Sequence, residues 1–131
     1  MIKIYNENCF NTMKRIGKSV DVIMTSPPYN MTKRKGGTSD KGRYDVYTDW
    51  LGEKEYLQFT VNLFNEFDKI LKQNKVIIYN FSYSIENPSL PYKLVTQIEN
   101  STDFMLVDTI IWKKKKRVTI SSKQKKIIKN I

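Results

Sequence analysis

The chain has 131 residues, of which 40% are hydrophobic and 12% aromatic, so it is long enough for one domain with a packed core. It contains no histidine and one cysteine, which excludes a Ser–His–Asp triad and argues against a zinc site. The single Cys9 cannot form an internal disulfide, so we expect a cytoplasmic protein. No apolar run approaches the ~18 residues of a membrane span, so no membrane contact is expected.

The predicted elements alternate between strands and helices. Residues 2–6 predict a strand, 9–16 a helix, and 20–25 a strand of the buried parallel type. Residues 31–52 are charged, contain glycine and predict a long loop, and 53–71 carry apolar residues at helical spacing. A strand over 75–83, a helix over 91–100 and a strand over 104–112 follow. The order predicts an α/β domain with a largely parallel sheet.

The segment Thr25-Ser26-Pro27-Pro28-Tyr29-Asn30 directly follows the 20–25 strand. Ligands of such sheets bind beyond the carboxyl ends of the strands, so this segment is the candidate site. Proline fixes φ and supplies no N–H, which holds neighbouring groups rigidly. As a bare tetrapeptide, Ser-Pro-Pro-Tyr fits a tight turn equally well.

Ser26-Pro27-Pro28-Tyr29 resembles the catalytic motif of site-specific DNA amino-methyltransferases, which act on adenine N6 or cytosine N4. Three further segments match in order: "NENCFNTMKRI" at the N-terminus, "YDVYTDW" at 44–50 and "DTIIWKK" at 108–114. The resemblance covers residues 1–114 and implies part of a Rossmann-like, S-adenosylmethionine-dependent fold.

The chemistry that the resemblance implies explains these residue types. An exocyclic amine is a poor nucleophile because its lone pair is delocalised into the ring. The Ser26 hydroxyl and the Pro27 carbonyl would accept hydrogen bonds from the N–H groups of the amine and so localise its lone pair on the nitrogen. Tyr29 would stack on a base flipped out of double-stranded DNA. The implied catalytic residues are Ser26, Pro27, Pro28 and Tyr29, with no metal.

The resemblance also implies other contacts. Asn8, Cys9 and Thr25 would border S-adenosylmethionine, although a helix cap explains Asn8 equally well. The expected DNA-binding residues are Asn30, Lys33, Arg34, Lys35 and Arg43, for which a solvated loop is the alternative.

The family's glycine-rich cofactor loop has no counterpart here, since no glycine follows Gly52. We therefore expect 1–114 to be the N-terminal part of the catalytic domain, completed in a longer frame or by a partner chain. Residues 113–131 carry nine Lys or Arg and no acid. The tail at 115–131 is interpreted as out-of-frame translation after an adenine run, or as a DNA-binding tail.

The function expected from the sequence is methylation of cytosine N4 or adenine N6 in DNA, in a restriction–modification or phage setting, with a restriction endonuclease as a further partner. The chain alone is expected to be inactive. A non-catalytic DNA-binding module acting through the basic tail is the alternative, and methylation of RNA or of a protein glutamine is a further one.

Overall fold

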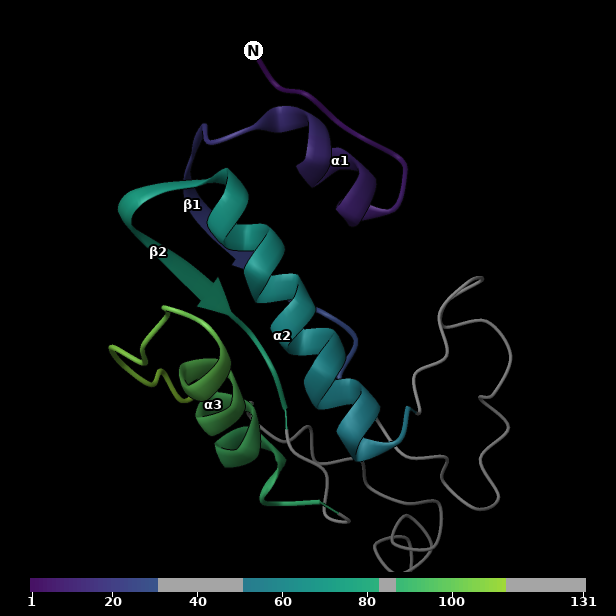
Figure 1. Cartoon of the computed structure of the whole chain (residues 1–131), viewed down its shortest axis with the longest axis vertical. Coiled ribbons are helices and arrows are strands. Elements are labelled where there is room, and N and C mark those ends of the chain that lie inside the picture. The colour runs from purple at the N-terminus through teal and green to yellow at the C-terminus, as the bar shows by residue number, and fades with distance from the viewer. Residues whose placement is uncertain (31–50, 83–86, 113–131) are drawn as a thin grey trace, which may run out of the picture.

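The computed structural model describes residues 1–30, 51–82 and 87–112. Within these ranges the elements are α1 (Cys9–Ile16), β1 (Val20–Thr25), α2 (Glu53–Ile70), β2 (Leu71–Tyr79) and α3 (Leu90–Ser101). Figure 1 shows α2 crossing the two strands, with α1 beside its carboxyl-terminal half and α3 beside its amino-terminal half. None of the helices in the described ranges is long and apolar enough to cross a membrane.

The two strands β1 and β2 pair in parallel, with Val22 opposite Val76 and Thr25 opposite Tyr79. A parallel pair requires a crossover, and α2 lies in that connection. The predicted α/β class with parallel strands is therefore confirmed for these elements. The parallel pairing also brings the carboxyl ends of both strands to the same edge.

The core lies between the sheet and the helices and is centred on α2. One cluster joins Met13 of α1 to the carboxyl-terminal half of α2, where Phe64 and Phe67 are buried. A second cluster joins Tyr56 at the amino-terminal end of α2 to Leu90 and Leu94 of α3. The predicted helices over 9–16, 53–71 and 91–100 are confirmed to within one residue at each end.

None of the described residues covers the other face of the sheet. Val22, Met24, Val76 and Ile78 alternate along the strands with residues that face the core, and each of the four is at least 44% exposed. The prediction of strands buried on both faces was therefore wrong for the described part of the chain. The helices in that part cover only the opposite face.

The predictions of two further strands were wrong. Residues 2–6 have no regular structure, and Tyr5 is 47% exposed. Residues 104–112 likewise form no strand. Phe104 packs against Phe64 with ring centroids 5.5 Å apart, whereas the large apolar side chains after it are exposed.

Strand β2 starts and ends four residues earlier than the predicted 75–83 strand. This difference matters because it places Asn80 just beyond the strand rather than within it. The predicted loop over 31–52 lies outside the described residues except for its last two positions.

Candidate active site at the carboxyl ends of the strands

The Ser26–Asn30 segment begins where β1 ends, at the edge where β2 also ends. The Asn80 backbone N–H continues the pairing by donating to the Thr25 carbonyl over 2.9 Å. This bond extends the sheet by one step and sets the Asn80 side chain beside that of Ser26. The sheet itself thus positions the two side chains.

Three polar side chains meet at this edge. The Ser26 Oγ and Tyr29 Oη atoms are 2.6 Å apart, and we call these two groups the hydroxyl pair. Asn80 Nδ2 donates to Ser26 Oγ over 3.0 Å and to Tyr29 Oη over 2.8 Å. Ser26 and Asn80 are exposed and Tyr29 is half-buried, so the cluster is open to a ligand.

The backbone of the segment is anchored from α2. Tyr56, whose side chain is fully buried, donates its hydroxyl to the Pro28 carbonyl over 2.7 Å. Pro27 is buried as well, and both prolines fix their own φ. The hydroxyl pair therefore stands on a backbone with little freedom to move.

Asn30 closes the segment. It adopts a positive φ of 52°, which asparagine tolerates better than most residues. Its Oδ1 accepts from the Leu51 N–H over 2.6 Å, and its Nδ2 donates to the Leu51 carbonyl over 2.9 Å. Residues 30 and 51 are thereby joined next to Tyr29. The amide predicted to bind DNA is used in this contact.

The remaining predicted DNA-binding residues lie outside the described residues. They are Lys33, Arg34, Lys35 and Arg43. The chain leaves the described region at Asn30 and returns at Leu51, so the segment that carries them starts and ends beside the hydroxyl pair. Their contact with DNA stays a prediction.

The residues predicted to border a cofactor are not brought together by any contact that the described structure shows. Asn8 caps α1, since its Oδ1 accepts from the Phe10 N–H over 3.0 Å. This confirms the cap that the sequence left as an alternative. Cys9 is exposed at the start of α1, and Thr25 ends β1.

Sequence reasoning missed two residues of the site. Asn80 lay inside the predicted 75–83 strand, and an earlier strand end would have placed it at the same edge as Ser26. Tyr56 was predicted only as part of the apolar face of the 53–71 helix. Apolar spacing reveals that its ring is buried but not where its hydroxyl points.

The ion pairs found among the described residues do not include the hydroxyl pair or Asn80. Lys72, near the start of β2, is 3.1 Å from Asp21 of β1, and this contact lowers the pKa of Asp21. Glu53 of α2 pairs with Lys93 of α3 over 2.6 Å, and hydrogen bonds from Lys93 and then Asn87 lower its pKa. In the described ranges, no group of three or more Cys, Asp or Glu side chains could hold a metal.

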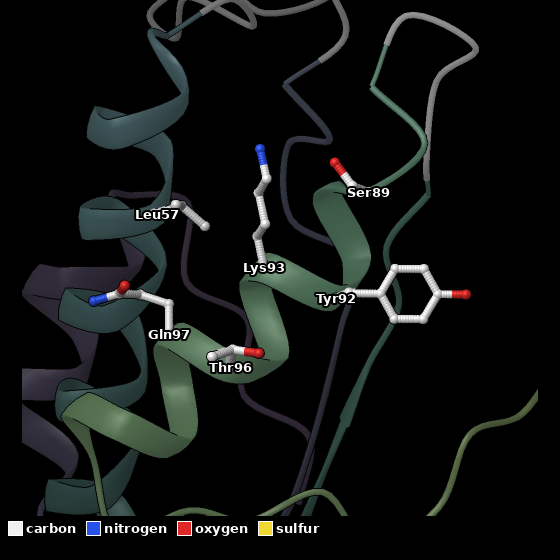
Figure 2. Close-up of a pocket in the computed structure, with 6 residues that line it drawn as sticks. All are labelled: Leu57, Ser89, Tyr92, Lys93, Thr96 and Gln97. Carbon is white, nitrogen blue, oxygen red and sulfur yellow. The ribbon is translucent and has the colours of Figure 1, made fainter.

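A shallow groove of about 330 Å³ lies between α2 and α3 (Figure 2). It contains no residue of the Ser26–Asn30 segment. It is lined by Leu57, Ser89, Tyr92, Lys93, Thr96 and Gln97. We therefore place the candidate site at the hydroxyl pair rather than in this groove.

Comparison with known proteins gives one match, to a family model. The N6/N4 family model, described as DNA methylase, matches residues 20–130. The match begins with β1 and includes the hydroxyl pair, Tyr56 and Asn80. No match was found among curated proteins or solved structures.

Proposed function

The chain belongs to the DNA methylase family of the N6/N4 type, and from this we propose that it binds the target amine during methylation of cytosine N4 or adenine N6. The proposal includes S-adenosylmethionine as methyl donor, a Rossmann-like sheet around β1 and β2, and a restriction–modification or phage setting. Ser26, the first residue of the motif, slightly favours cytosine over adenine as the target base.

One observation carries the proposal: Ser26 Oγ is a hydrogen-bond acceptor held at the carboxyl end of a parallel strand by Asn80 Nδ2, 3.0 Å away. An acceptor at the amine draws an N–H toward it and opposes delocalisation of the nitrogen lone pair into the ring. The Pro27 carbonyl supplies a second acceptor for the other N–H. Because both acceptors are fixed before the base arrives, little reorganisation is needed when it reacts.

The described residues fit the amine but do not form a cradle for S-adenosylmethionine. Neither strand is followed by glycine, since Ser26 follows β1 and Asn80 follows β2. A glycine there would let the backbone approach the donor closely. When bound, the donor would supply an activated methyl group, and we assign no residue of the described ranges to hold it.

Double-stranded DNA is the proposed partner, with the target base turned out of the helix toward Ser26. The Lys and Arg residues of 31–50 would contact phosphates close to that base. A restriction endonuclease is a further proposed partner, and its only support is the proposed restriction–modification setting.

The test is a binding measurement with two duplexes, one fully paired and one with a cytosine opposite an abasic site. An unpaired base costs less to extrude, so the chain should bind the second duplex about tenfold more tightly. Ser26→Ala should reduce this preference without lowering stability, because Ser26 is exposed. Equal affinity for the two duplexes would refute the proposal.

Two controls separate other functions. Deletion of 113–131 should weaken binding to both duplexes equally if the tail is a general DNA-binding module, and should leave their ratio unchanged. Incubation with S-adenosylmethionine, followed by identification of product nucleosides, would show which base is methylated. We expect little turnover from the chain alone, and efficient turnover would overturn that expectation.

A further inference from the structure

Both chain neighbours of Tyr29 are bonded to the amino-terminal end of α2. Pro28, before it, accepts the Tyr56 hydroxyl at its carbonyl over 2.7 Å. Asn30, after it, accepts from the Leu51 N–H at Oδ1 over 2.6 Å and donates from Nδ2 to the Leu51 carbonyl over 2.9 Å. The backbone of Tyr29 is therefore held on both sides by contacts from one end of one helix.

Leu51 is a firm attachment point because the start of α2 is itself held in place. Gly52 follows Leu51 as the N-cap residue of α2. The Gly52 N–H donates to Glu55 Oε2 over 3.2 Å, and the Gly52 carbonyl accepts from the Tyr56 N–H over 2.9 Å. The Leu51 side chain packs against the buried cluster that joins α2 to α3. A side chain bonded to the backbone of Leu51 therefore takes its position from the packed core.

The far end of the Tyr29 side chain is held from the other strand. Its hydroxyl accepts from Asn80 Nδ2 over 2.8 Å and lies 2.6 Å from Ser26 Oγ. When both the backbone and the hydroxyl of a tyrosine are fixed, the direction of its ring is fixed as well. Loosening either end would let the ring turn away from that direction.

We propose that Asn30 is a positioning residue, whose amide fixes the direction of the Tyr29 ring before the target base arrives. This inference rests on the proposed function, with Tyr29 stacking on the extruded base as predicted from the sequence. A ring that is already in place does not have to be ordered when the base binds, so more of the stacking energy appears as affinity. The alternative is the DNA contact predicted from the sequence, in which the Asn30 amide binds the nucleic acid directly.

Asparagine suits this position for two reasons. Its φ of 52° lies in the left-handed region, which asparagine and glycine adopt more readily than other residues. Its amide also carries both a donor and an acceptor, so it can bond to the N–H and the carbonyl of Leu51 as a second backbone would. The substitution Asn30→Gly therefore removes the amide and keeps the conformation that the chain needs here.

The experiment uses the full-length chain and two duplexes, one fully paired and one with a cytosine opposite an abasic site. The natural chain should prefer the second duplex about tenfold. Asn30→Gly should reduce this preference to about threefold, a loss of the size expected for one hydrogen bond, and should leave affinity for the paired duplex unchanged. A direct DNA contact or a merely structural role would weaken binding to both duplexes equally, and the unchanged ratio would overturn the proposal.

Asn74 provides the matched control. It is the other non-glycine residue of the described ranges with a positive φ, 56°, and it is exposed in the amino-terminal half of β2. Asn74→Gly makes the same chemical change away from the hydroxyl pair and should keep the tenfold preference. If it lowers the preference as much as Asn30→Gly does, the effect does not come from the Leu51 contact and the proposal fails.

A double-mutant cycle shows whether Asn30 acts through Tyr29. In a Tyr29→Ala background no ring remains to be positioned, so Asn30→Gly should lower the preference no further. If Asn30→Gly lowers the preference by the same factor with and without the ring, Asn30 acts independently of Tyr29 and the proposal is wrong.

Hydrogen exchange checks the contact itself in the absence of DNA. The Leu51 N–H should exchange about tenfold faster in Asn30→Gly than in the natural chain, because its acceptor is gone. Asn74→Gly should leave this rate unchanged. Equal exchange rates in the natural chain and in Asn30→Gly would also overturn the proposal.

The outcomes separate this inference from the proposed function. If the natural chain prefers the unpaired cytosine and Asn30→Gly keeps the full preference, the inference is overturned and the proposed function stands. If the natural chain binds both duplexes equally, the proposed function is refuted and the inference falls with it.

Discussion

The hydrogen bond from Tyr56 to the Pro28 carbonyl should contribute measurably to stability. Tyr56→Phe keeps the ring, which stacks on Phe59 with centroids 6.4 Å apart, and removes only the hydroxyl. The Pro28 carbonyl then loses its 2.7 Å donor in a half-buried position. We expect a loss of about 1.5 kcal/mol, between the net worth of a hydrogen bond and the cost of an unpaired buried group.

Urea unfolding followed by circular dichroism measures this loss. With a slope of about 2 kcal/mol per molar urea, 1.5 kcal/mol lowers the midpoint by about 0.7 M. Tyr92→Phe is the matched control, because Tyr92 is 76% exposed and its loss of a hydroxyl should leave the midpoint unchanged. An unchanged midpoint in Tyr56→Phe would refute the reasoning, since the buried bond would then carry no net energy.

Two further predictions concern the scaffold. Gly17→Ala should destabilise the chain by about 1–3 kcal/mol, because Gly17 has φ 59° and ψ −172°, a conformation almost restricted to glycine. The control Gly52→Ala should cost much less, because Gly52 has φ −55°. Similar urea midpoints for the two variants would contradict this reasoning. Lys93 lowers the pKa of Glu53 below its ordinary value of 4.5. The ionised Glu53 should therefore stabilise the fold above pH 4.5, and this stabilisation should be lost as the pH falls through the folded-state pKa. Glu53→Gln should therefore be less stable than the natural chain at pH 7, and the difference should shrink as the pH falls below 4.5. A difference that stays constant as the pH is lowered would count against the pairing.

The helices were predictable because the signals that define them are local. The apolar spacing over 53–71 reports a single face, and the structure buries that face from Tyr56 to Ile70. Asn8 precedes 9–16 as a cap, and it does cap that helix. Neither conclusion depends on a distant part of the chain.

The strands were predicted less well because strands depend on distant partners. Residues 104–112 have the composition of a strand, but no neighbour in the described structure pairs with their backbone. The predicted 75–83 strand includes Phe81, which packs against the cluster of Tyr56, Leu90 and Leu94 instead of extending β2. The prediction of strand structure was therefore wrong for Phe81, which is partly buried by packing against helices.

The residues of the site also fall into two groups, those that the sequence located and those that it missed. Ser26 and Tyr29 belong to one contiguous motif, and the strand before it indicated where they lie. Asn80 is 54 residues from Ser26, and Tyr56 is 28 residues from Pro28. Such pairs can be found from sequence only when the strand ends and the inward face of the helix are known to the residue.

The two missed residues give the motif its fixed geometry, so folding and recognition should be linked through them. Tyr56 belongs to the packed junction of α2 and α3 and holds the Pro28 carbonyl, whereas Asn80 continues β2 and holds the hydroxyl pair. Tyr56→Phe should therefore weaken binding of every unpaired base to a similar extent, because it loosens the backbone beneath both hydroxyls. Asn80→Asp should weaken the same binding by a separate route, because a carboxylate only accepts and cannot donate to Ser26 Oγ and Tyr29 Oη as the Asn80 amide does.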